Sequence, residues 1–300
     1  MTARVVLSIA GSDPSGGAGI QADLKTFGAL GVFGTSVLTA LTAQNTRGVF
    51  GVHPVPAGFV ARQLDVLLDD VEVHATKIGM LAGADIARVV VDVLSRCAVG
   101  PVVLDPVMVA TSGDRLLDTE AVAVVRDDLL PLADLVTPNV PEAAVLLGVD
   151  PARGLPEMIE QAEELLRRSG TAVLLKGGHL DGVDSVDLDG VDSVDLDGAD
   201  SVDVLATTEG TRLISRPRVA TTATHGTGCT LSAAIAALAA LRPVVQTGRD
   251  DVGWDDVVED ARDYLQGALA AGVDLGVGHG HGPVDHFHRQ FPTRARRTTS

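Results

Sequence analysis

Short β-branched and aliphatic runs alternate with longer amphipathic segments along most of this 300-residue chain. Such alternation is typical of a mostly parallel sheet covered by its connecting helices. We expect strands at residues 5–10, 35–43, 76–78, 102–105, 135–137 and 172–176. We expect helices at residues 19–30, 57–70, 84–96, 120–130, 141–147, 156–169, 230–241 and 254–271. Because no Pro/Gly/Ser-rich linker divides these segments, the pattern predicts a single α/β domain.

The composition of the chain is strongly acidic and gives a formal net charge of −17. Lysine occurs only at Lys25, Lys77 and Lys176, so nearly all basic residues are arginines. An acidic surface almost without lysine is typical of adaptation to concentrated salt, although high genomic GC content also favours arginine. The acidic balance argues against a nucleic-acid partner.

The apolar segments and the cysteines indicate the cellular compartment that we expect for this protein. The longest apolar runs are far shorter than the roughly 20 residues of a membrane span, so we expect no membrane partner. The apolar start of the chain is short and passes directly into Gly/Asp-rich sequence, which favours a first strand over a signal peptide. Two cysteines, Cys97 and Cys229, do not make a disulfide framework. We expect a cytoplasmic protein.

A glycine-rich turn, His225-Gly-Thr-Gly-Cys229, directly precedes an Ala/Leu/Ile run at helical spacing. A turn that feeds a helix start aims several backbone N–H groups at one point, where the helix dipole also favours negative charge. This geometry suits a phosphate or a developing anionic oxygen, and the same field would favour a Cys229 thiolate. Taken alone, the segment fits equally well a glycine-capped helix with an inert buried cysteine.

A second glycine-rich stretch, Gly11 to Asp23, follows the first expected strand. It lacks the Lys-Ser/Thr ending of a Walker A loop and the register of a dinucleotide fingerprint. It is either a plain strand-to-helix turn or a wall for a small ligand, with the Asp23 carboxylate as an acceptor. Gln44 closes an apolar strand and offers both a donor and an acceptor, as the edge of a heterocycle requires.

Polar residues at three other strand ends could bind a metal nucleotide. Asn139 and Glu142 are three residues apart at a helix start, a spacing that suits hydrated Mg²⁺ but equally an N-terminal capping box. Asp105 could add a second carboxylate. Lys176 ends a strand beside two glycines, where a point charge suits a nucleotide phosphate.

Three segments have no role in the expected binding of a metal nucleotide and a small ligand. An acidic octad begins at Asp181 and recurs from Asp189 and Asp197. We interpret the segment of about 181–204 as an exposed loop or hairpin extension, with ion binding as the alternative. The histidines at 279, 281, 286 and 288 could bind a metal, but a glycine-rich turn is the simpler account. Residues 289–300 form a basic tail that we expect to be disordered, so the folded domain should span residues 1–288.

Several motifs together identify a family. The chain closely resembles hydroxymethylpyrimidine/phosphomethylpyrimidine kinases of thiamine biosynthesis almost from end to end, although the Asn-x-x-Glu motif is shared across the ribokinase superfamily. The segments that carry the resemblance are Ala10–Thr26, Thr39–Thr46, Lys77–Leu81, Leu104–Met108, Thr137–Glu142, Lys176–His179, Thr224–Ser232 and Gly282–His288.

This resemblance implies a ribokinase-like three-layer α/β/α fold and two successive ATP-dependent phosphoryl transfers. The first acceptor would be the hydroxymethyl group of 4-amino-5-hydroxymethyl-2-methylpyrimidine, and the second would be the resulting monophosphate. Gln44 would hydrogen-bond the aminopyrimidine, in a pocket lined by Gly11, Ala18, Asp23, Met80 and Val107.

The remaining roles follow from the same resemblance. Lys176, Asn139 and Thr227 would contact ATP, while Asp105 and Glu142 would organise Mg²⁺ together with Asn139. Gly226, Thr227 and Gly228 would form the anion hole, and Cys229 would act as the base where many ribokinase relatives have an aspartate. We also expect a homodimer. The octad repeat departs from the family pattern and puts the contacts of a lid in doubt.

Two other functions stay open. A pyridoxal or pyridoxine kinase of the same fold is one, because similar glycine-turn cysteines serve those enzymes. A non-catalytic sensor of a pyrimidine or of thiamine is the other, although such a binder would not need Lys176, Glu142 and Cys229.

Overall fold

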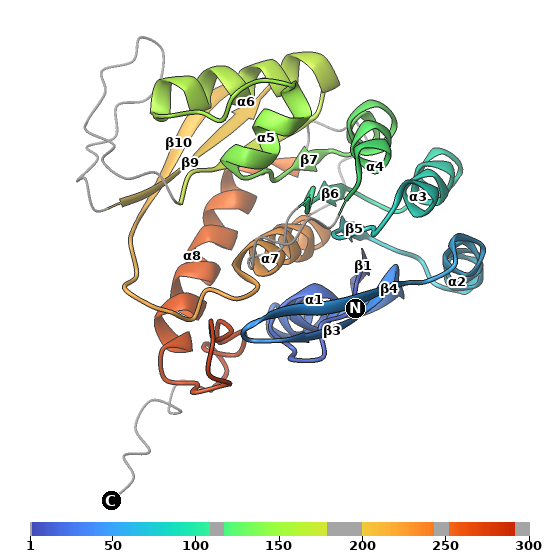
Figure 1. The fold of residues 1–300 in the computed structure, drawn as a ribbon, viewed down its shortest axis with the longest axis horizontal. Coiled ribbons are helices and arrows are strands. Elements are labelled where there is room, and N and C mark those ends of the chain that lie inside the picture. The colour runs from blue at the N-terminus through green and yellow to red at the C-terminus, as the bar shows by residue number, and fades with distance from the viewer. Residues whose placement is uncertain (1, 109–116, 179–199, 243–251, 292–300) are drawn as a thin grey trace, which may run out of the picture.

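The central sheet of this computed structural model has eight strands within the described residues, which are 2–108, 117–178, 200–242 and 252–291. In chain order the strands are β1 (Val5–Ala10), β2 (Phe33–Leu38), β5 (Ala75–Ile78), β6 (Val102–Leu104), β7 (Leu135–Val136), β8 (Ala172–Lys176), β9 (Asp200–Thr207) and β10 (Gly210–Pro217). Their spatial order is β10-β9-β8-β7-β6-β5-β1-β2 (Figure 1). Every pair from β2 to β8 is parallel, and β9 is antiparallel to both of its neighbours.

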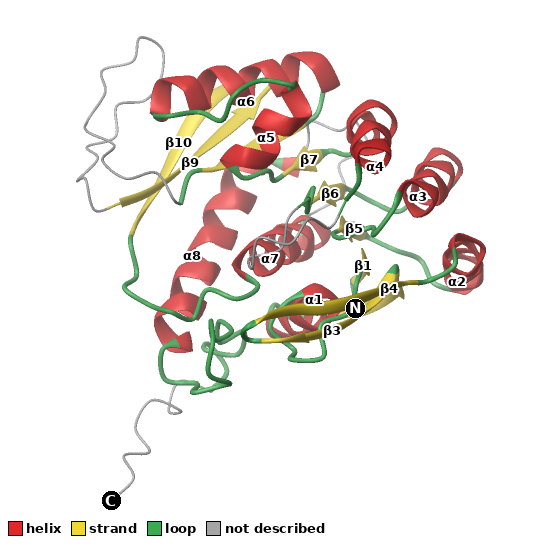
Figure 2. Ribbon diagram, in the orientation of Figure 1, coloured by secondary structure: helices red, strands yellow, loops and turns green. Residues whose placement is uncertain are grey.

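Helices cover both faces of this sheet and give three layers (Figure 2). One face packs against α1 (Gly19–Ala29), α7 (Thr227–Leu241) and α8 (Trp254–Gly272), and their apolar side chains form one buried cluster. The other face carries α2 (Ala57–Asp70), α3 (Ala84–Arg96), α4 (Thr119–Val124), α5 (Val140–Leu147) and α6 (Leu155–Ser169), which form a second cluster. The predicted three-layer fold with a mostly parallel sheet is therefore confirmed.

Helix α7 is the central element of its layer. It lies between α1, α8 and the strands β1, β5 and β6. Its sequence is apolar on all sides and rich in alanine, as a helix buried all round must be. Sequence periodicity placed its start at Thr230, but the helix begins at Thr227, so Cys229 lies in its first turn. No helix in the described ranges is long and apolar enough to cross a bilayer.

The predicted strand at residues 35–43 is wrong as a single element. The chain leaves the central sheet after Leu38 and forms β3 (Ala40–Asn45), which pairs with β4 (Gly48–Pro54) in a separate two-stranded sheet. Thr39 makes the break: its N–H donates to the Ala10 carbonyl and its hydroxyl to the Met80 carbonyl. Strand β4 was not predicted, because its glycines and terminal proline are typical of loops.

The predicted helix at residues 120–130 is also irregular. After α4 the chain continues as a π-turn over Val125–Leu129 and a 3₁₀ turn over Leu130–Leu132. Pro131 lies in this last turn and lacks the N–H that a continuing α-helix needs.

Two predicted boundaries move where the structure describes them. Most of the octad segment 181–204 lies outside the described residues, but its last five residues belong to β9, and Val202 and Val204 are buried. The basic tail does not start at residue 289. The Arg289 guanidinium lies 5.4 Å from the centroid of the Tyr264 ring, and Gln290 donates to the Ala29 carbonyl. Residues 292–300 are outside the described part.

Candidate active site

The predicted site residues converge at the carboxyl ends of the parallel strands. Gly11 follows β1, Gly79 and Met80 follow β5, Asp105 follows β6, and Lys176 ends β8. The N-terminus of α7 lies against the same edge, since the backbone of Gly228 is close to Asp105 and Lys176. This edge is where open α/β sheets bind ligands.

Two glycine loops touch each other there. The first glycine loop (residues 11–19) leads from β1 to α1, and the second glycine loop (residues 225–228) leads into α7. Gly226 is left-handed, with a φ of 78°, and a Cβ at this position would lie 1.7 Å from the Gly17 carbonyl oxygen. A Cβ on Gly17 would lie 2.3 Å from Cδ2 of His225. Gly226 requires glycine because its backbone contacts that of Gly17, whereas a side chain on Gly17 would overlap the His225 imidazole.

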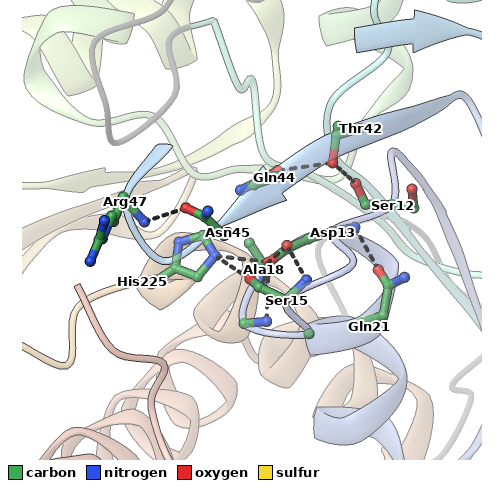
Figure 3. Close-up of polar contacts among 12 residues, drawn as sticks. Ser12, Asp13, Ser15, Ala18, Gln21, Thr42, Gln44, Asn45, Arg47 and His225 are labelled. Carbon is green, nitrogen blue, oxygen red and sulfur yellow. Dashed lines mark hydrogen bonds and ion pairs between the residues drawn. The ribbon is translucent and has the colours of Figure 1, made fainter. Parts of the chain in front are cut away.

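A hydrogen-bond network around Asp13 ties the two glycine loops together (Figure 3). Nε2 of His225 lies 2.8 Å from a carboxylate oxygen of Asp13. The same carboxylate accepts hydrogen bonds from the backbone N–H groups of Ser15, Gly17 and Ala18. Burial alone would raise the pKa of Asp13, but the hydrogen bonds from His225, Ser15 and Ala18 outweigh it and lower the pKa to about 2.

The Asp13–His225 pair was not predicted from the sequence. The two residues are 212 positions apart, so no spacing rule connects them. The one available signal was their place within the two glycine loops.

Lys176, Asp105 and Gly228 form the candidate phosphate end of the site. Nζ of Lys176 lies 3.1 Å from Oδ1 of Asp105. A Cβ on Gly228 would lie 3.6 Å from Nζ of Lys176 and 3.7 Å from Oδ2 of Asp105. The lysine side chain keeps 18% of its surface exposed, whereas Asp105 is almost fully buried. A cation and the start of a helix therefore face one point, which is the arrangement that binds a phosphate.

Asn139 and Glu142 form the capping box that was the alternative to a metal site. Asn139 Oδ1 accepts from the Glu142 N–H, and Glu142 Oε2 accepts from the Asn139 N–H, each at 2.8 Å. Burial raises the pKa of Glu142 to about 7; the positive charge of Lys176 opposes this shift, and Asp105 adds to it. Both functions are compatible, because a capping carboxylate keeps lone pairs for a second partner.

The donor set suits Mg²⁺ bound together with phosphates. Mg²⁺ takes one or two protein carboxylates and completes its shell with water and phosphate oxygens. Asp105 and Glu142 are close enough for the charge of the first to act on the second. Among the described residues no three or more His, Cys, Asp or Glu side chains gather as a metal cage.

Cys229 lies in the first turn of α7 and is partly exposed. The expectation that the helix field favours its thiolate does not hold, because burial raises the pKa of the thiol to about 11, and the positive charge of Lys77 only partly offsets this. The cysteine is therefore a thiol at neutral pH.

The hairpin of β3 and β4 covers the first glycine loop. Thr42 and Gln44 alternate with exposed residues along β3 and are half-buried on its inner side (Figure 3). The Thr42 hydroxyl donates to the Ser12 carbonyl and lies 3.1 Å from Gln44 Oε1. The structure thus places Gln44 beside the first glycine loop.

Four other predicted pocket residues lie in the loops of the same edge. Met80 reaches Gly11, where a Cβ would lie 2.4 Å from its methyl carbon. Ala18 belongs to the first glycine loop, and Val107 follows Asp105; both are half-buried. The Met80 methyl group therefore fills the space beside Gly11.

Asp23 corrects the prediction of a free carboxylate acceptor. Its side chain has no exposed surface and forms an ion pair with Lys77, whose Nζ lies 2.9 Å from both carboxylate oxygens. The Ser8 hydroxyl donates to one of these oxygens at 2.6 Å. The carboxylate is thus bound within the fold, in the layer beneath the site.

Comparison with known proteins places the chain in a family. The phosphomethylpyrimidine kinase family model matches residues 13–285. The hydroxymethylpyrimidine/phosphomethylpyrimidine kinase of Escherichia coli is 52% identical over 282 residues, which are 94% of this chain and 97% of that protein. A thiamine biosynthesis multifunctional protein of Corynebacterium efficiens is 47% identical over 94% of this chain and 35% of its own length.

A solved structure agrees in fold. The ADP complex of Bacillus subtilis pyridoxal kinase has a TM-score of 0.81 and 31% identity, covering 96% of this chain and 99% of that one. Fold and site thus define a ribokinase-like small-molecule kinase. The chain belongs to the phosphomethylpyrimidine kinase family.

Proposed function

We propose that this protein phosphorylates 4-amino-5-hydroxymethyl-2-methylpyrimidine with ATP, first to the monophosphate and then to the diphosphate, in thiamine diphosphate biosynthesis. The observation that carries the proposal is the meeting of Lys176, Asp105 and the backbone of Gly228 at the start of α7, with Gln44 held over the first glycine loop. The names of the Escherichia coli and Corynebacterium relatives support the substrate and the pathway.

The second glycine loop would stabilise the transferring phosphoryl group. Phosphoryl transfer depends mainly on positioning and on stabilising charge. The N–H groups of Gly226, Thr227 and Gly228 at the start of α7 would hydrogen-bond the equatorial oxygens, with Lys176 and Asn139 contacting the nucleotide. The contact of Gly226 with Gly17 fixes the loop before substrate arrives.

Cys229 would receive the proton of the acceptor hydroxyl. The hydroxymethyl oxygen attacks the γ-phosphorus, the bond from that phosphorus to the bridging oxygen breaks, and ADP leaves with those electrons. The proton of the hydroxyl passes to Sγ of Cys229. Since the resting thiol has a pKa of about 11, Sγ would first have to give its own proton to solvent water, and only the resulting thiolate could accept the proton of the hydroxyl.

Mg²⁺, held by Asp105 and Glu142, would neutralise charge on the ATP phosphates. Lys176 already lies beside Asp105, so the lysine would bind a phosphate oxygen directly, while the carboxylate would act on the same phosphate only through the cation. Ionised Glu142 is the form that binds a cation, and its pKa of about 7 makes this form available near neutral pH.

Pyridoxal kinase is the second candidate, since the Bacillus subtilis neighbour carries that name on the same fold. The homodimer, the cytoplasmic location and the salt adaptation expected from sequence remain predictions.

A panel of acceptors tests the proposed function. We expect ADP formation with hydroxymethylpyrimidine and with its monophosphate, at a kcat/KM well above that for pyridoxal and pyridoxine, because this ratio measures discrimination. Gln44→Ala should weaken both pyrimidines through KM. The absence of turnover with either pyrimidine, in low and in high salt, would contradict the proposal, and a higher kcat/KM for pyridoxal would favour the second candidate.

A further inference from the structure

Lys77 is a buried lysine that no ligand role uses. It lies on β5, and its side chain and that of its partner Asp23 have no exposed surface. Burial of two charges is costly, and a well-packed apolar pair of similar volume is often at least as stable. The stability of the core therefore does not explain why the chain has an ion pair at this place.

The position of the pair points to the second glycine loop. Helix α7 packs against both β5, which carries Lys77, and α1, which carries Asp23. Nζ of Lys77 extends toward the strand end, where a Cβ on Gly79 would lie 2.8 Å from it. Cys229 lies in the first turn of α7, which packs on both elements, and it receives a hydrogen bond from the backbone of Gly19 at the start of α1.

The charges around Cys229 come from three elements. Lys77 on β5 contributes a positive charge, while Asp23 on α1 and Asp105 after β6 contribute negative ones. Burial alone would lower the pKa of Lys77, but Asp23, Cys229 and Asp105 together raise it, so the amine stays protonated. Lys77 in turn acts to lower the pKa of Cys229, against burial and the two carboxylates.

We propose that Lys77 is a positioning residue for phosphoryl transfer: its ammonium group, held by Asp23, compensates the negative charge of the Cys229 thiolate that accepts the proton. This inference rests on the proposed kinase function, in which Cys229 has that role. Lys77 does not contact the substrate, and Asp23 fixes the ammonium group through the two 2.9 Å contacts.

Thiol alkylation tests the inference without any turnover. The chain has only two cysteines, so the Cys97→Ser variant leaves Cys229 as the single thiol. Because the thiolate is the species that iodoacetamide alkylates, the rate against pH gives the pKa of Cys229. The measurement uses mass spectrometry of the intact protein, in the absence of nucleotide, over the alkaline pH range.

The two partners of the ion pair predict shifts of opposite sign. In Lys77→Met the thiolate loses its compensating charge, and alkylation at a fixed pH should slow by about tenfold or more, a shift of at least one pKa unit. In Asp23→Asn the ammonium is freed from its carboxylate, and alkylation should become faster. The double variant, which removes both charges and leaves neither unpaired, should fall between them. Arg88→Met, an exposed cation on α3, is the control and should change nothing.

A purely structural role predicts a different result. Both single variants would then lose stability, and their alkylation profiles would coincide with the parent or shift in the same direction; either result overturns the inference. If Lys77→Met does not fold, as judged by circular dichroism, the alkylation rates of the other two variants decide. Faster alkylation in Asp23→Asn than in the double variant supports the inference, and equal or slower alkylation overturns it.

Kinetics separate this inference from the proposed function. With a working kinase, Lys77→Met should lower kcat by about tenfold or more, leave the KM of the pyrimidine unchanged, and regain kcat as pH rises. If the parent protein phosphorylates no acceptor, the proposed function fails while the alkylation profiles still report on Lys77. If the kinase works and the profiles do not move, only the inference on Lys77 fails.

Discussion

Gly226→Ala adds a single methyl group, and the structure predicts that this methyl greatly lowers kcat. Gly226 has a φ of 78°, and the added methyl would lie 1.7 Å from the Gly17 carbonyl oxygen. An ordinary contact starts at 3.4 Å, so the two glycine loops would have to separate by about 1.7 Å. The atom that must move is backbone, which has no alternative rotamer.

The magnitude follows from two effects. The left-handed conformation costs an alanine about 1–2 kcal/mol. Separation of the loops displaces the N–H groups of the second glycine loop, and a misplacement of about 1 Å can cost roughly 100-fold in rate. We therefore expect kcat to fall by about 10²–10³-fold, with a stability loss of at least about 1–2 kcal/mol.

Gly148→Ala is the matched control. Gly148 caps α5 with a φ of 72°, and a Cβ there meets nothing within 4 Å. The free energy of unfolding of Gly148→Ala, measured in urea, should fall by about 1 kcal/mol, and its kcat should not change. This variant has the same backbone strain as Gly226→Ala but no clash with another loop. Steady-state ADP release on both variants gives the comparison. Equal kcat values for the two variants would refute the reasoning that contact between the loops builds the phosphate site.

Three further predictions concern side chains of the same site. Cys229→Ala should lower kcat by about 10²–10⁴-fold and leave the KM of the pyrimidine nearly unchanged; an unaltered kcat would remove the cysteine from the proton transfer. Lys176→Met should raise the KM of ATP and lower kcat, without weakening pyrimidine binding in calorimetry. Asp13→Asn should cost about 1–2 kcal/mol in urea unfolding at neutral pH. Because the pKa of Asp13 is lowered to about 2, this stability is present above its ordinary value of 3.8 and is lost as pH falls through about 2. A loss that persists unchanged in acid would mean that the stabilisation does not depend on the ionised Asp13 carboxylate.

The sequence predicted the parts of the site that are local. Lys176, Asp105 and the second glycine loop each stand at a strand end or helix start that periodicity can locate, and parallel strands bring such ends to one edge. For the same reason the three-layer architecture could be predicted, while exact boundaries such as the start of α7 could not.

Contacts between distant segments could not be predicted from the sequence. Asp13 and His225 pair across 212 residues, and Asp23 and Lys77 across 54, so no spacing rule connects them. Asp23 looked like a ligand residue because it ends a glycine-rich stretch, and only the packing of α1 on the sheet shows that it is buried. The break at Thr39 is tertiary as well, because its partners are the Ala10 and Met80 carbonyls.

The product time course tests the central claim most directly. The purified protein is mixed with Mg²⁺, ATP and hydroxymethylpyrimidine, and the phosphorylated products are followed by mass spectrometry. The account predicts that the monophosphate appears first and then declines as the diphosphate accumulates, with both steps slowed by about 10²–10³-fold in Gly226→Ala and retained in Gly148→Ala. A protein that consumes no ATP with this acceptor, or whose Gly226→Ala variant makes both products at the parent rate, would contradict it.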